Sequence, residues 1–177
     1  INPSSPSLSG EFKTTLIETE QLLNRDLLIK KINETQGKVF LIDTYSTETF
    51  SKAEQSEILK NINFLTYSTK KHSTAFFIFT NKKLIWSGST SKGKNVVFTI
   101  NKKVDLNKIK TVFIDTESVF YENYTTQNVI GFLNGYSKTD STIVVTAHYD
   151  HLGKMGRKTF FPGANDNASG VALLLDL

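Results

Sequence analysis

The sequence predicts an α/β fold arranged in two units. Short apolar runs rich in β-branched and aromatic residues alternate with longer segments whose apolar residues recur at helical spacing. A second series of strand-like runs follows this strand–helix–strand order, which is typical of a chain with two units. Hydrophobic residues make up 38% of the 177 residues and charged residues 21%, so there is enough apolar material for a hydrophobic core.

The first unit is expected to combine two helices with short strands. Apolar positions such as Leu16, Leu23 and Leu27 recur at helical spacing and predict a helix over about 14–32, and the same periodicity predicts a second helix over 52–66. Strands are predicted at 37–43, 74–80, 83–87 and 95–100. The second of these strands shows little alternation, so both of its faces should be covered. The last two flank a turn rich in Gly, Ser and Lys and are expected to pair as a hairpin.

The second unit is expected to begin with strands and to continue into a helix. Its strands are predicted at 110–115, 126–135 and 141–150, and its helix at 168–177. The Ser- and Pro-rich residues 1–10 are expected to form a flexible leader. Residues 11–112 would then form an accessory α/β domain, and residues 113–177 the first part of a second domain.

Charge and composition exclude several classes of function. Ten lysines and a single acid, Asp105, lie between Lys70 and Lys110, mostly as pairs between apolar runs where solvated turns fall, so no nucleic-acid partner is expected. No apolar run approaches the roughly 18 residues of a membrane span. The chain has no cysteine, which excludes disulfides and thiolate chemistry. The segment 88–95 nearly matches a P-loop, but Asn95 stands where Ser or Thr is needed.

The N-terminal residues bear on location. The sequence begins with Ile1 in place of Met, its first ten residues are rich in Ser and Pro, and it lacks cysteine. These features are expected of a processed, exported protein that acts in the periplasm or outside the cell. Nothing in the sequence indicates an oligomeric state.

Three polar residues in the last third of the chain carry the chemistry. His148 and Asp150 follow the apolar run IVVTA, and residues at the carboxyl ends of buried strands face the ligand crevice of α/β proteins. Imidazole is the commonest zinc ligand, and Asp150, two residues on, is placed to accept the other ring N–H. Asp166 lies among small residues just before a predicted helix, where its carboxylate could bridge two cations.

The segments AHYDHLG and PGANDNASGVA resemble the zinc aminopeptidases of metallopeptidase family M28. The resemblance covers about residues 126–177 and implies a mixed sheet sandwiched by helices, two zinc ions and peptide substrates. It implies that His148 binds one zinc ion, that Asp150 orients His148, and that Asp166 bridges both ions. The family's general base and remaining ligands come later in the chain, so the 177 residues alone are expected to be inactive. His151 has no ligand role in the family and is expected to be a wall or structural residue.

Other interpretations compete with this one. The element order of residues 37–101 loosely resembles the protease-associated domain that accompanies many M28 peptidases. The alternative is that these residues form an unrelated α/β accessory domain. A non-catalytic module that binds peptide or protein, with an incomplete metal site, is the alternative to an exopeptidase. Glutaminyl cyclases share the peptidase fold but resemble a single-zinc variant, and the residues around Asp166 favour the peptidase.

Overall fold

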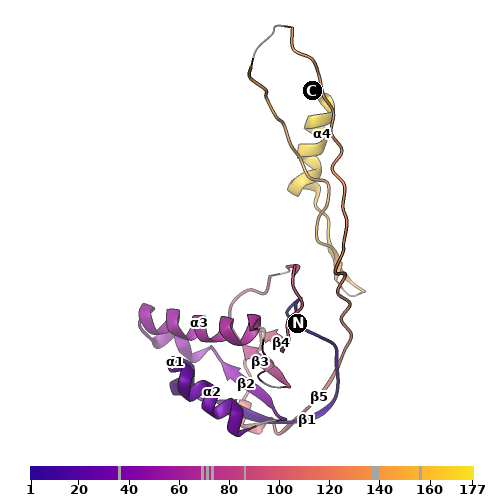
Figure 1. Ribbon diagram of the computed structural model, residues 1–177. Coiled ribbons are helices and arrows are strands. Elements are labelled where there is room, and N and C mark those ends of the chain that lie inside the picture. The colour runs from indigo at the N-terminus through magenta and orange to yellow at the C-terminus, as the bar shows by residue number, and fades with distance from the viewer. Residues whose placement is uncertain are drawn as a thin grey trace. The chain divides into compact units, whose positions relative to one another are not determined.

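Four parallel strands and one antiparallel strand form the sheet of the N-terminal part of the chain (Figure 1). They are β1 (Leu8–Ile17), β2 (Val39–Asp43), β3 (Ala75–Phe79), β4 (Val96–Ile100) and β5 (Thr111–Thr116). Their order across the sheet is β4-β3-β2-β1-β5, and β5 runs antiparallel to β1. The predicted α/β class is therefore confirmed.

The structure is a computed structural model that describes residues 1–35, 37–68, 70, 72, 74–85, 87–136, 140–155 and 157–177. Contacts divide the chain into two units, Ile1–Tyr124 and Thr125–Leu177. The boundary expected from the sequence, between residues 112 and 113, falls inside β5. Because β5 pairs with β1 over six residues, the whole strand belongs to the sheet of the first unit. The assignment of residues 11–112 as an accessory domain stays a prediction.

Three helices pack on one face of this sheet: α1 (Thr19–Leu23), α2 (Arg25–Glu34) and α3 (Lys52–Tyr67). The Asn24 side chain caps α2 by accepting from two backbone amides. At the start of α3, Ser51 and Glu54 form a reciprocal capping box. The predicted helix at 52–66 is confirmed, and short 3₁₀ turns complete the unit at Ser46–Thr49 and Leu106–Lys108.

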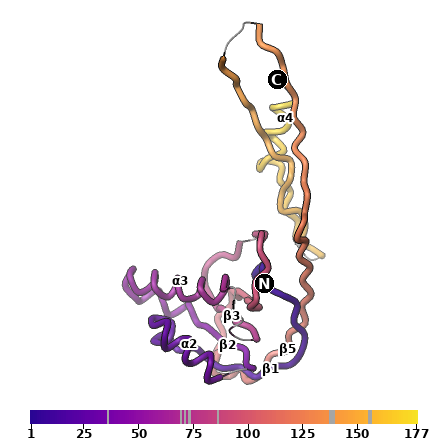
Figure 2. The backbone as a smooth tube through the Cα atoms, viewed as in Figure 1, coloured from indigo at the N-terminus to yellow at the C-terminus, as the bar shows by residue number. Residues whose placement is uncertain are grey.

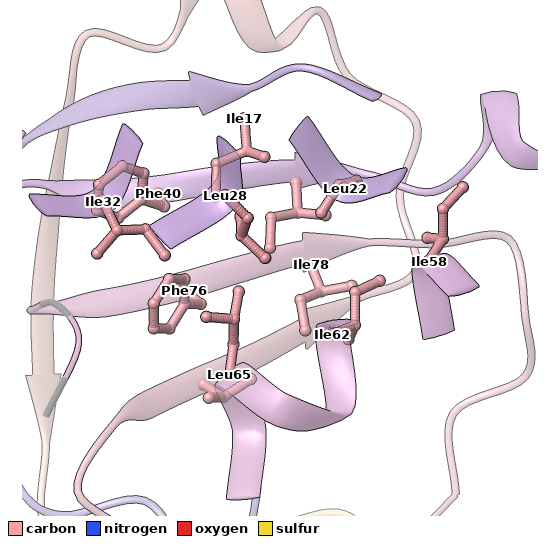
Figure 3. Close-up of a cluster of buried hydrophobic side chains, with 12 residues drawn as sticks. Ile17, Leu22, Leu28, Ile32, Phe40, Ile58, Ile62, Leu65, Phe76 and Ile78 are labelled. Carbon is pink, nitrogen blue, oxygen red and sulfur yellow. The ribbon is translucent and has the colours of Figure 1, made fainter. Parts of the chain in front are cut away.

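The main hydrophobic core lies between these helices and the sheet (Figure 3). Phe40 of β2 and Phe76 of β3 are fully buried, and their rings stack with centroids 5.7 Å apart. They are opposite each other in the parallel register, so the stack joins the two central strands. Further side chains from β1, β3, β4 and all three helices surround this pair: Ile17, Leu22, Leu28, Ile32, Ile58, Ile62, Leu65, Ile78 and Val97.

A second cluster covers the opposite face of the sheet. Alternate residues of the central strands, among them Leu41 and Phe79, point to this side and pack with Leu106 and Ile114. The segment between β4 and β5 and the strand β5 itself supply this cover. The expectation that residues 74–80 are a strand buried on both faces is confirmed.

The helix predicted over 14–32 was wrong in its first part. Residues 8–17 form β1, which pairs with β2 on one side and β5 on the other, and these pairings outweigh the local helical spacing of Leu16 and Leu23. The expected flexible leader is also partly ordered against the sheet. Ser4 and Ser5 are buried, and Asn2 N–H donates to Val97 O while Val97 N–H donates to Ser5 Oγ.

The hairpin predicted from residues 83–87 and 95–100 was wrong as well. The second strand exists as β4, but it pairs in parallel with β3, so the connection is a crossover. The described residues of 83–87 contain no strand, and Trp86 lies outside the described residues.

The second unit contains a small hairpin and a helix. Strands β6 (Gly153–Met155) and β7 (Thr159–Phe161) pair in an antiparallel manner, and α4 (Ser169–Asp176) follows a π-type turn at Ala164–Ala168. The predicted helix at 168–177 is confirmed. No described helix of the chain is both long and apolar enough to cross a membrane.

The strands predicted at 126–135 and 141–150 are not formed. Their described residues contain no helix or strand, and Figure 2 shows the tube of this region as long uncoiled stretches. Apolar side chains such as Val129 and Ile143 are 94% and 92% exposed, contrary to the buried strand that the apolar run IVVTA predicts. A strand needs a hydrogen-bonded partner, and no described residue pairs with these segments in a ladder.

The stacked pair in the core predicts a large effect of truncation. Phe76→Ala should lower the free energy of unfolding of the first unit by about 3–5 kcal/mol, because it leaves a cavity beside Phe40. Phe113→Ala is the matched control, since this ring is 73% exposed on β5 and its loss should cost about 1 kcal/mol or less. Urea unfolding followed by circular dichroism measures both, and equal losses would contradict this description of the core.

His72 is a group of the first unit whose titration should affect stability. Its ring contacts Phe64, with centroids 5.0 Å apart, and its Nε2 lies 2.7 Å from Ser68 Oγ. Burial, with a smaller contribution from Lys70, lowers the pKa of His72 below its ordinary value of 6.5. The unfolded chain therefore binds a proton at pH values where the folded protein keeps this ring neutral.

Acidification should accordingly destabilise the first unit. The stability contributed by neutral His72 is present above pH 6.5 and is lost as the pH falls through the lowered pKa. The free energy of unfolding should drop more between about pH 7.5 and 5.5 in the wild type than in His72→Gln, which does not titrate. Parallel pH profiles for the two proteins would rule out this role of His72.

Candidate metal site

His148 and Asp166 meet in the second unit. His148 Nε2 lies 3.2 Å from Asp166 Oδ1, although eighteen positions separate them in the sequence. Both side chains are accessible, with 52% and 74% of their surface exposed. The structure therefore brings together the two residues that the sequence nominates as metal ligands, while their role as ligands stays a prediction.

Asp150 lies on the other side of the His148 ring. His148 Nδ1 is 3.0 Å from the backbone carbonyl oxygen of Asp150 and 3.6 Å from its carboxylate Oδ1. A hydrogen on Nδ1 can therefore be donated to the backbone oxygen of Asp150, whereas the carboxylate, which the spacing predicts as the acceptor, lies beyond hydrogen-bond distance. His148 does not follow a strand as expected, so this local contact orients the ring.

This arrangement has a chemical consequence for the space between His148 and Asp166. If Nδ1 carries the hydrogen, Nε2 of the neutral ring is an acceptor, and it faces a carboxylate oxygen that is also an acceptor. Two acceptors at 3.2 Å repel each other unless a proton or a cation lies between them. Tetrahedral zinc, with ligand distances of about 2.0–2.2 Å, holds a nitrogen and an oxygen donor roughly 3.3 Å apart. The donor types and their separation thus fit zinc.

A compact turn presents Asp166. Gly163 has φ +68°, in the left-handed region, and its carbonyl oxygen accepts from Ala168 N–H at 3.2 Å. Ser169 Oγ donates to Asn165 O and links this turn to the first residue of α4. The small residues of the motif let the backbone turn closely, as the sequence indicates.

The described residues supply only part of a coordination shell. Among residues 1–35, 37–68, 70, 72, 74–85, 87–136, 140–155 and 157–177, no group of three or more His, Cys, Asp or Glu side chains is placed to hold a metal ion. His72, the histidine of the first unit, contacts Ser68 and Phe64 and takes no part in this site.

His151 has a contact that the sequence analysis did not anticipate. It packs against the Cα of Gly163, so closely that a Cβ added to Gly163 would lie 2.7 Å from His151 Cβ. The residue treated as a wall or structural residue thus touches the turn that carries Asp166. The contact depends on the hairpin between residues 153 and 161, which the local sequence pattern did not predict.

Comparison with known proteins agrees with the chemistry of this segment. A histidine beside a carboxylate is a donor pair that metal-dependent hydrolases use, and residues 128–177 match the family model of peptidase family M28. The chain is also 28% identical over 147 residues to aminopeptidase YwaD of Bacillus subtilis (strain 168). These matches support an M28 family peptidase, most directly for the C-terminal segment 128–177.

The extent of these matches is limited in two ways. The alignment with YwaD covers 81% of this chain but 29% of the relative, so the chain spans less than a third of that protein's length. No solved structure matches the chain.

Proposed function

We propose that this chain is part of a zinc-dependent aminopeptidase, with His148 and Asp166 as zinc ligands. The observation that carries the proposal is the 3.2 Å approach of His148 Nε2 to Asp166 Oδ1, inside the segment that matches family M28. The aminopeptidase relative supports the exopeptidase class, and the family resemblance supports peptide substrates and two zinc ions in the complete site. Asp166 is the proposed bridging ligand.

The chain's own residues would orient the histidine ligand and supply negative charge at this site. Asp150 holds a hydrogen on His148 Nδ1, which keeps Nε2 available as a donor to a metal ion. Asp166 contributes negative charge from a turn just before α4. Bound zinc would polarise the scissile carbonyl and supply an activated water. The general base and the remaining ligands are assigned by the family resemblance to residues not among these 177.

Zinc binding tests the proposed ligands. Titration of the purified chain with zinc, followed by calorimetry, should show binding that His148→Ala and Asp166→Asn each weaken by at least about tenfold. The matched controls are His72→Ala, which removes a histidine from the first unit, and Asp176→Asn, which neutralises an exposed carboxylate of α4. Both controls should bind as the wild type does. Wild-type affinity in His148→Ala would eliminate the proposed site.

We further propose that these 177 residues do not hydrolyse peptides by themselves. Two metal-binding side chains without a general base cannot complete a metal-activated hydrolysis. An amino-acid p-nitroanilide incubated with the zinc-loaded chain should release no product above the rate of the His148→Ala variant. Steady hydrolysis that a chelator abolishes would overturn this proposal.

Residues 1–124 fit an accessory role in this proposal. They have their own sheet, their own helices and two hydrophobic clusters of their own. This independent core also favours a second candidate function, a module that binds peptide or protein. A protease-associated type of domain and export from the cell remain part of the proposal for the parent protein.

A further inference from the structure

The hairpin β6–β7 sets the register of the two arms that lead toward His148 and Asp166. Gly153 pairs with Phe161, Lys154 with Phe160 and Met155 with Thr159. In each pair the two partners lie equally far from Arg157 along the sequence. The Lys154 ammonium lies 5.2 Å from the centre of the Phe160 ring, a cation–π contact between directly opposed residues that supports this register.

Two contacts outside the hairpin follow the same symmetry. His151 and Gly163 each lie six positions from Arg157, and they are in close contact. His148 and Asp166 each lie nine positions from it, and their side chains are 3.2 Å apart. Antiparallel pairing accounts for the pattern within the hairpin, and the two outer contacts keep the arms opposed beyond the ladder, up to the turn Ala164–Ala168 that carries Asp166.

The His151–Gly163 contact lies, along both arms of the chain, between the hairpin and the residues proposed to bind the metal. The backbone of Gly163 is left-handed, and there is no room for a side chain there because His151 Cβ and Cγ would lie 2.7 and 2.8 Å from its Cβ. Gly153 has nearly the same φ, +67°, yet open space surrounds the position of its Cβ. The close approach at Gly163 is therefore specific to the contact with His151.

We propose that His151 is a positioning residue for the metal site. By packing on Gly163 it holds the turn that carries Asp166 against the arm that carries His148. The proposal rests on the proposed function, since it assigns the contact a purpose in aligning those two ligands. It adds no ligand, and His151 itself does not bind the metal.

Two glycine substitutions provide a matched test. Gly153→Ala and Gly163→Ala introduce the same methyl group at nearly the same φ, but only the second methyl meets His151. The probe is Co²⁺ alone, and its binding is followed by the visible absorption of the ion. Gly163→Ala should bind Co²⁺ about tenfold more weakly than Gly153→Ala does. His151→Gly, which removes both atoms that pack most closely on Gly163, should also weaken binding, because nothing then holds the turn that carries Asp166. Equal affinity of the two glycine variants, or wild-type affinity in His151→Gly, would overturn the proposal.

A second measurement separates this proposal from the metal site itself. The side-chain ¹⁵N resonance of His148 Nε2, recorded without metal, should shift in Gly163→Ala and in His151→Gly, and stay near its wild-type position in Gly153→Ala. If the wild type binds Co²⁺ no better than His148→Ala, the proposed metal site fails, while these shifts still decide the role of His151. An unchanged His148 resonance in Gly163→Ala counts against positioning.

Discussion

The parallel pairing of β2 with β3 is the interaction on which the rest of the first unit depends. These central strands are short, but each residue of one is matched with a residue of the other, and the stack of Phe40 on Phe76 ties them together on the helical face. Because successive side chains point to opposite faces, the same strands also anchor the second cluster through residues such as Leu41. Strands β1 and β4 pair with β2 and β3, respectively, and the helices pack on them. The sheet can therefore form without any residue of the metal site.

Much of the first unit could be predicted because its signals are local. Helix α3 combines apolar periodicity with Ser51 and Glu54 at the spacing of a capping box, and β2 and β3 are continuous apolar runs. Strand β1 escaped prediction because Leu16, Leu23 and Leu27 share a helical spacing although Leu16 belongs to a strand. What decides the conformation of residues 8–17 is pairing with β2 and β5, and such partners are distant in sequence.

At the candidate metal site, too, the residue types could be predicted from local sequence, whereas their arrangement depends on contacts between separate segments. The types and order of His148, Asp150 and Asp166 could be taken from the sequence, since they belong to two recognisable segments. Their geometry could not, because it depends on a hairpin between those segments that the sequence analysis did not predict. The strands expected before His148 failed for a related reason: apolar β-formers such as Val144 favour a strand, but a ladder requires a second strand beside it.

The first residues of the chain affect whether the sheet can pair with other molecules. Strand β4 ends the sheet, and a terminal strand offers unpaired backbone groups to any other extended chain. Here Asn2 and Ser5 already occupy the amide and carbonyl of Val97, and Ser4 accepts from Gly93 N–H in the segment leading into β4. The N-terminal residues thus protect this edge against intermolecular sheet growth. Removing the residues that precede β1 would expose this edge and favour aggregation through β4.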